Sequence, residues 1–322
     1  MPEVRAPRWA IVRYRRAGAD PPYFDPRADH AAPFEGYYWR FSEPVHGRVV
    51  IALCGLCRLP GQRWAVVALA AHPGSRVHEV VAQPADANSD SFGVRAGQVV
   101  AASDRAVRFD LGAAALSVEL VPTSTWPRRR WGGSGVGQLL PGLPQYWHPW
   151  LLGGAARGEA TIDGERIPLN GAHVYAEKNW GRAFPERWWW GQADTFDAGD
   201  ACVAFAGGPL RVAGLGLTPT LVAIRIGERL ISLAPPLAQT AATVGADSWR
   251  LLTRSPGYAV EIEGDGRGSS VRLPVPAPDR VAVEPRSTQA LAGWLRVAVK
   301  RRRRTLFRGE SELAGLEHES EP

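Results

Sequence analysis

Residues 170–197 hold the densest group of side chains that could do chemistry in this chain. An acid, a base, an amide and an indole occupy four consecutive positions, Glu177-Lys178-Asn179-Trp180. Successive side chains of a β-strand point to opposite faces. A strand over residues 173–180 would therefore gather imidazole, phenol, carboxyl and amide groups on one face, where they could exchange protons and hydrogen-bond a polar ligand. These residues are His173, Tyr175, Glu177 and Asn179.

The strand expected next carries large aromatic side chains at alternate positions. One face would present Trp188, Trp190, Gln192, Asp194 and Phe196, with Trp189 on the other face. Polar groups that alternate in step with aromatic ones are typical of a lined cavity. A polar strand end beside ordinary core tryptophans would give the same pattern, and the spacing alone does not separate the two interpretations.

Lysine is nearly absent from the chain, and one of its two lysines lies in this segment. Of the 38 basic residues, only Lys178 and Lys300 are lysines. Lys300 lies next to a run of arginines, whereas Lys178 is the isolated exception. Lysine and arginine are not equivalent where a compact ammonium group is needed. The imbalance therefore singles out Lys178 as a candidate functional residue.

The composition is that of a globular chain rich in turns. Of the 322 residues, 45% are apolar and 22% are charged, which excludes a disordered chain. The 35 glycines and 27 prolines show no triplet period, so they exclude collagen and favour short strands joined by turns. Eight of the 13 tryptophans lie between Trp126 and Trp190, which supports an aromatic-lined cavity.

Most segments alternate with a period of two, which predicts a nearly all-β fold that positions these residues. A helix is considered only for residues 287–295. About 16–20 strands fit two consecutive lipocalin-like antiparallel barrels better than one large barrel. We place the boundary near residue 155, with an N-terminal barrel over 1–155 and a C-terminal barrel over 156–322. The expected strands include residues 34–41, 48–59, 64–71, 76–83, 173–180, 188–196 and 294–300, and a hairpin around Gly112.

Residues 131–156 contain no Asp, Glu, Lys or Arg and are long enough to span a bilayer. Their seven glycines and three prolines argue against a continuous helix. We expect a long Gly/Pro-rich connection that is buried or touches lipid. Arginines 128–130 precede it beside two tryptophans, so this loop is the candidate surface for peripheral membrane contact.

The remaining features exclude several classes of function. The net charge of +6 is moderately basic. Solvated turn or rim charge is the favoured interpretation of the clusters at 128–130 and 300–304, with a membrane-interface patch as the alternative for the first, and no nucleic-acid partner is expected. The seven histidines are scattered and no P-loop or H-E-x-x-H motif occurs, so neither metal nor cofactor is expected. The three cysteines show no obvious disulfide pairing, which favours a reducing compartment. The N-terminus lacks the apolar stretch of a signal peptide, so we expect a cytoplasmic location.

Three sequence blocks resemble those of the tocopherol cyclase family. The run from Tyr175 to Trp190 resembles its signature, in which Ala-Glu-Lys-Asn-Trp-Gly and a downstream Phe-Pro precede an aromatic strand. Residues 34–40 are similar to the family's Phe-Glu-Gly-Trp-Tyr element, and residues 145–148 to its Tyr-Gln-Trp-His element. The blocks occur in family order. The family is similar in architecture to carotenoid hydratases and other lipocalin-like double-barrel proteins, which implies the same fold here.

The resemblance implies a cofactor-free cyclisation of a prenylated hydroquinone, in which the phenol adds across the nearest prenyl double bond to give a chromanol. A neutral, buried carboxyl must protonate the alkene, and aromatic faces must stabilise the cation in a site that excludes water. The candidate catalytic residues are Asp194, Glu177, Glu35 and Lys178. The residues expected to bind the substrate are Asn179, Trp180, Trp188, Trp190, Gln192, His173, Tyr175, Tyr38 and His148.

Two departures from the family pattern leave other functions open. Asp194 stands in place of an amide, and Gly191 in place of a bulkier residue. The chain could instead be a lipocalin-like carrier of an isoprenoid or lipid, or a hydratase that acts on an isoprenoid. The expected partner in each case is a prenylquinol or another isoprenoid, and the sequence does not indicate an oligomeric state.

Overall fold

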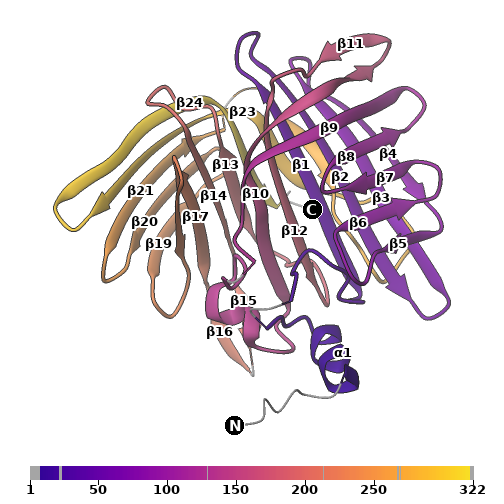
Figure 1. Ribbon diagram of the computed structural model, residues 1–322, viewed down its shortest axis with the longest axis horizontal. Helices are drawn as coiled ribbons and strands as arrows, with labels where there is room; N and C mark the ends of the chain where they lie inside the picture. Colours follow the sequence, from indigo (N-terminus) through magenta and orange to yellow (C-terminus); the bar gives the residue numbers. More distant parts are fainter. Residues whose placement is uncertain are drawn as a thin grey trace.

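The computed structural model describes residues 8–21, 24–128, 130–212, 214–266, 268 and 270–319. Two large antiparallel sheets lie side by side and contain most of these residues (Figure 1). They confirm the predicted fold of two consecutive barrels, of which the first is nearly closed and the second is a half-barrel. Within the described residues, no helix is long and apolar enough to cross a membrane.

The first sheet contains twelve strands, all from residues 34–181. They are β1 (Phe34–Glu43), β2 (Arg48–Leu59), β3 (Gln62–His72), β4 (Arg76–Ala82), β5 (Ala85–Ala87), β6 (Gly93–Ala96), β7 (Val100–Ser103), β8 (Ala106–Asp110), β9 (Ala114–Thr125), β10 (Gln145–Ile162), β11 (Glu165–Pro168) and β12 (His173–Gly181). The order is β4-β3-β2-β1-β12-β10-β9-β8-β7-β6-β5, with β11 paired to β10. The sheet curls until β5 contacts β2 and β3, and the inward apolar side chains fill the barrel.

The second sheet contains ten strands. They are β13 (Trp189–Ala193), β14 (Ala201–Gly207), β17 (Thr220–Ile226), β18 (Arg229–Leu233), β19 (Gln239–Val244), β20 (Ser248–Arg254), β21 (Tyr258–Asp265), β22 (Ser270–Pro274), β23 (Pro285–Arg301) and β24 (Arg304–Glu319). The last strand, β24, pairs with both β13 and β23 in the middle of the sheet. A small hairpin, β15 (Leu210–Val212) and β16 (Leu215–Leu217), extends the connection between β14 and β17.

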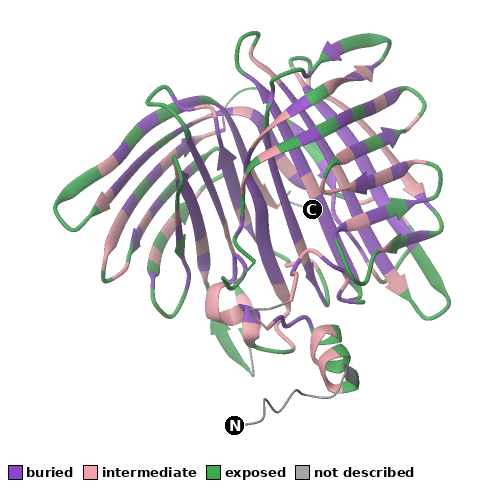
Figure 2. Cartoon of the chain, in the orientation of Figure 1, coloured by how far each residue is buried: buried purple, intermediate pink, exposed green. Residues whose placement is uncertain are grey.

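The two sheets face each other through their central strands. Strand β1 is buried along almost its whole length, because one face lines the first barrel and the other packs toward the second sheet. Figure 2 shows the same continuous burial for the strands in the middle of the molecule, in contrast to the banded pattern of the outer strands. Because both faces of β1 are buried, the side chains of each face can contribute to a different site.

The structure changes three details of the predicted elements. Residues 287–295 are not helical but lie within β23, because their apolar residues pack on a sheet rather than around a helix. Residues 131–156 are a loop only in their first part, since β10 begins at Gln145. The helix α1 (Arg8–Arg16) lies where no helix was expected. Residues 1–7 and Arg129, which entered the predictions about targeting and membrane contact, lie outside the described residues.

The switch between the sheets lies later in the chain than the predicted boundary. Residue 155 falls inside β10, in the first sheet, and β12 also belongs to that sheet. The second sheet begins only with β13, so residues 182–188 connect the two. A division into domains at residue 155 stays a prediction, whereas the sheets themselves change over within this connection.

Candidate active site

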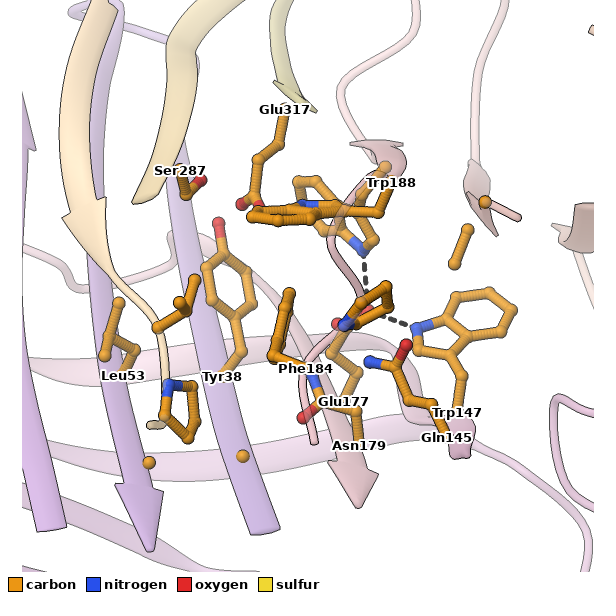
Figure 3. A pocket seen from close by; sticks show the side chains of 18 of the residues that line it. Tyr38, Leu53, Gln145, Trp147, Glu177, Asn179, Phe184, Trp188, Ser287 and Glu317 are labelled. Carbon is orange, nitrogen blue, oxygen red and sulfur yellow. Dashed lines mark hydrogen bonds between the residues drawn. The ribbon is translucent and has the colours of Figure 1, made fainter. Parts of the chain in front are cut away.

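A pocket lies between the two sheets rather than inside either barrel. Strands β1, β2, β10 and β12 supply one wall, and β13, β14, β22 and β24 supply the other, together with the connection at residues 184–188. Figure 3 shows Glu177 and Glu317 among aromatic side chains that come from both walls. The predicted residues that line the pocket are Tyr38, Glu177, Asn179, Trp188 and Trp190.

Glu177 is the central carboxyl of the first wall. Its Oε2 accepts hydrogen bonds from the Tyr175 hydroxyl at 2.6 Å and from the indole nitrogens of Trp147 and Trp190, each at 2.8 Å. The side chain is only 5% exposed. Burial raises the pKa of Glu177 above its ordinary value, although the three donors act in the opposite direction. The group therefore stays protonated at higher pH than a free glutamic acid, while the three donors offset part of the cost of forming its carboxylate.

Glu317 is a second carboxyl in the same pocket, supplied by β24. Its Oε1 accepts a hydrogen bond from the Trp188 indole nitrogen at 2.7 Å. Burial raises the pKa of Glu317 to about 7, and the neighbouring Glu177 acts in the same direction. Two interacting carboxyls titrate as a pair, so at neutral pH one can hold a proton while the other is ionised.

Aromatic rings and one close backbone approach shape the rest of the pocket. Tyr38 packs edge-on against Trp190 with ring centroids 5.2 Å apart, and Phe184 packs against Trp188 at 4.8 Å. Gly36 lies opposite Asn179 on the neighbouring strand, and a Cβ there would approach the Asn179 Oδ1 too closely. Glycine at this position leaves room for the Asn179 amide beside the aromatic walls.

The strand register explains why only part of the signature reaches the pocket. Tyr38 pairs with Glu177, and Gly36 with Asn179, on the outer face of the first barrel. Lys178 and Trp180 point to the other face of β12, into the end of the barrel, because successive side chains alternate. The two faces of one short strand therefore serve two different sites.

Lys178 is fully buried in a network of charged groups at the end of the first barrel. Its Nζ lies 2.7 Å from Glu35 Oε2 and donates to the Ala28 carbonyl oxygen at 2.6 Å. Burial alone would raise the pKa of Glu35, but Lys178 and Arg58 hold it well below its usual value. The network joins β1 and β12 to the segment that follows α1, which favours an anchoring role over contact with a pocket ligand.

His30 completes this network as a neutral imidazole. Lys178 Nζ lies 3.0 Å from His30 Nδ1, and because an ammonium can only donate, Nδ1 is the acceptor. The Nε2–H then donates to Asp20 Oδ2 at 2.5 Å. The ring stacks on Trp180 with centroids 4.1 Å apart. Both nitrogens are satisfied only in the neutral form.

Acid is expected to destabilise the fold through His30. Burial lowers the pKa of His30 from 6.5 to about 4. Its contribution to the free energy of unfolding is therefore fully present above pH 6.5 and is lost as the pH falls toward 4. The loss can reach about 3 kcal/mol. Urea denaturation at a series of pH values should show a steeper loss of stability in the wild type than in His30→Gln, and equal slopes would contradict this role.

Asp194 lies in a separate polar cluster between the sheets. The Arg40 Nη2 donates to the carbonyl oxygens of Leu291 and Leu313, which ties β1 to the second sheet. Asp194 is buried near Arg40, and burial raises its pKa although Arg40 acts in the opposite direction. Gln192 is also fully buried and donates to the Cys202 sulfur. Neither Asp194 nor Gln192 lines the pocket.

Three other predicted residues, Tyr175, His148 and His173, do not line the pocket themselves. Tyr175 contacts Glu177 directly, as described above. His148 pairs with Lys178 in register, on the barrel side, where burial lowers its pKa to about 3. His173 is exposed, and its Nδ1 lies 2.9 Å from the Asp194 carbonyl oxygen. The catalytic and binding roles assigned to all these residues stay predictions.

Sequence reasoning missed two groups in the pocket. Trp147 lies in the block at 145–148. Its hydrogen bond to Glu177 could not be predicted from the sequence, because it depends on the pairing of β10 with β12. Glu317 lies 140 positions after Glu177, in an alternating strand without a motif. Among the residues that the structure describes, no cluster of three or more His, Cys, Asp or Glu side chains could hold a metal ion.

A profile described as "Tocopherol cyclase-like" matches residues 65–319. The probable chloroplastic tocopherol cyclase of Oryza sativa subsp. japonica is 32% identical over 166 residues, which are 47% of this chain and 35% of that protein. The chloroplastic tocopherol cyclase of Zea mays is 30% identical over 167 residues, 48% of this chain and 35% of that protein. Each match thus spans about a third of the plant protein.

Two solved structures are similar in fold. The crystal structure of CghA with Sch210972 has a TM-score of 0.58 at 12% identity and covers 90% of this chain and 88% of that chain. Kievitone hydratase from Nectria haematococca has a TM-score of 0.52 at 11% identity and covers 89% of this chain and 88% of that chain. These likenesses extend over both sheets and show the shared fold.

Proposed function

Because the chain belongs to the tocopherol cyclase-like family, we propose that it is an enzyme that cyclises a prenylated hydroquinone to a chromanol in the pocket between its two sheets. One observation carries the proposal. The pocket holds a buried carboxyl, Glu177, whose pKa is raised and whose Oε2 accepts three hydrogen bonds. Such a group can give a proton to an alkene and remain stable as the carboxylate that results.

The proposed reaction begins with proton transfer from Glu177 to the prenyl double bond. The tertiary cation that forms lies among the rings of Trp188, Trp190 and Tyr38, whose π faces stabilise positive charge. The phenol oxygen then forms the C–O bond and releases its proton to the Glu317 carboxylate. Glu177 has lost one proton and Glu317 has gained one, so exchange with solvent restores both groups and the product has the mass of the substrate.

The test is incubation of the purified chain with a prenylated hydroquinone in detergent micelles, followed by chromatography and mass spectrometry. A chromanol of unchanged mass supports the proposal. A product heavier by one water would instead assign a hydratase, the activity named for one protein of similar fold. Tryptophan quenching by the substrate without any product would assign a carrier.

The Glu317→Gln variant is expected to change the pH profile as well as the rate. The base must be ionised while Glu177 keeps its proton, so kcat/KM of the wild type should follow a bell-shaped pH profile whose acid limb requires ionisation of Glu317. The variant should lose this limb and about 10²-fold in kcat. Measuring kcat/KM across the neutral range for both proteins tests this role, and a limb that persists in the variant would exclude Glu317 as the base.

A further inference from the structure

We propose that the end of the molecule beside the pocket is a docking surface for an anionic lipid bilayer. Three segments form this docking surface: α1, the loop at residues 130–142 and the β15–β16 hairpin. The inference rests on the proposed function, because a prenylated substrate dissolves in a bilayer rather than in water. It goes beyond the uncharged loop noted in the sequence, since the two other segments contribute most of the exposed apolar area.

Exposed apolar side chains gather on the docking surface. Trp9 on α1 is 70% exposed, and Leu215 at the start of β16 is 68% exposed. Monomeric proteins rarely leave several large apolar side chains in water on neighbouring segments without a partner for them. The exposed large apolar residues of the three segments are Trp9, Val12, Trp131, Leu140, Leu215 and Leu217.

Hydrogen bonds and the pocket itself place these segments at one end of the molecule. The Gly142 N–H donates to the Ala17 carbonyl oxygen at 2.7 Å, and the Tyr14 hydroxyl donates to the Leu139 carbonyl oxygen, so α1 is joined to the loop. Leu210 and Pro219, at the two ends of the hairpin, line the pocket. Figure 1 shows α1, the magenta turn at residues 135–139 and β15–β16 together in its lower part.

The charge of the docking surface fits acidic headgroups. The described residues of the three segments include no aspartate or glutamate. Interfacial helices commonly pair exposed apolar residues with arginines that contact lipid phosphates. The exposed arginines on and beside these segments are Arg13, Arg16, Arg128, Arg130 and Arg211.

Apolar insertion beside the pocket would give the substrate a path from the bilayer without passing through water. The pocket residues of this end, Phe184 and Pro185, lie in the connection between the sheets and are partly exposed. An apolar ligand that leaves the acyl chains at this edge would meet aromatic surface first. The substrate would therefore pass from the bilayer at the docking surface directly into the pocket.

The experiment is flotation of the full chain with vesicles of phosphatidylcholine mixed with phosphatidylglycerol, and with vesicles of pure phosphatidylcholine. The wild type should float with the mixed vesicles at low salt and less so at high salt. Trp9→Ser combined with Leu215→Ser should lose most of this binding. Arg13→Gln and Arg16→Gln should each weaken partitioning about fivefold. The matched control is Val45→Ser, an 83% exposed side chain in the turn that follows β1, at the opposite end of that strand from the pocket.

Equal flotation of the docking variants and the wild type would overturn the proposal, and so would failure of the wild type to float with the mixed vesicles. Turnover in detergent micelles separates this result from the proposed function. The docking variants should keep the wild-type rate there, because their substituted residues do not line the pocket. A wild type that floats but turns nothing over would contradict the enzyme assignment and leave the docking surface intact.

Discussion

Glu177→Gln is expected to lower kcat for cyclisation by about 10²- to 10⁴-fold while substrate binding stays close to that of the wild type. Glutamine keeps the shape of the side chain and leaves an oxygen for the three donors, but its amide cannot supply the proton. Initial rates in detergent micelles measure the loss. Quenching of tryptophan fluorescence by the same substrate measures binding, because indoles line the pocket.

The matched control for this variant is Glu119→Gln, an exposed carboxyl on the outer strand β9. It should change neither the rate nor the binding. A Glu177→Gln protein that turns over at the wild-type rate would remove Glu177 as the proton donor. In that case Glu317 becomes the next carboxyl to test as the proton donor, because it lines the same pocket and burial raises its pKa to about 7.

The large expected effect follows from the surroundings of Glu177 rather than from its residue type. In water, a glutamic acid is almost entirely ionised at neutral pH and is a poor acid for an alkene. In the pocket, burial raises the pKa, and hydrogen bonds from Trp147, Trp190 and Tyr175 stabilise the carboxylate that proton transfer leaves behind. Both effects are in place before the substrate arrives, so the reaction does not have to organise them.

The alternation of side chains between the two faces of a strand could be predicted from the sequence, and it assigned residues of β12 to the correct faces. The face of Tyr175, Glu177 and Asn179 was expected from a period of two, and the register with β1 confirms it. The same rule separates Lys178 and Trp180 from that face. The family signature contains all five residues within six positions, 175–180, and for this reason the expected site included residues that lie on opposite sides of β12.

Contacts between distant segments could not be predicted. Glu317 reaches the pocket because β24 pairs with β13, a pairing that nothing in either strand specifies. His30 and Asp20 reach Lys178 because the chain after α1 crosses the end of the first barrel. The location of the pocket between the sheets also depends on how the two sheets pack. Barrel interiors here are filled by apolar side chains, so the space for a ligand remains where the sheets meet.

Lys178→Met is expected to destabilise the fold by about 3–5 kcal/mol, the usual cost of removing one partner from a buried ion pair. Methionine matches the length of the lysine side chain but removes one of the two cations that contact Glu35, and Arg58 stays as the ion-pair partner of this buried carboxylate. The matched control is the other lysine of the chain. Lys300 is 41% exposed and lies 3.3 Å from Glu261, so Lys300→Met should cost less than about 1 kcal/mol.

Urea denaturation of the two variants and of the Lys178→Met/Glu35→Gln double variant decides whether Lys178 anchors the fold or acts on the substrate. If Lys178 anchors the fold, the single variant is strongly destabilised and the double variant recovers part of the loss, because the buried charge that Lys178 compensated is gone. If Lys178 acts on the substrate instead, Lys178→Met keeps wild-type stability and loses turnover. The second outcome would move the catalytic site from the face of β12 that carries Glu177 to the interior of the first barrel, where Lys178 and Glu35 meet.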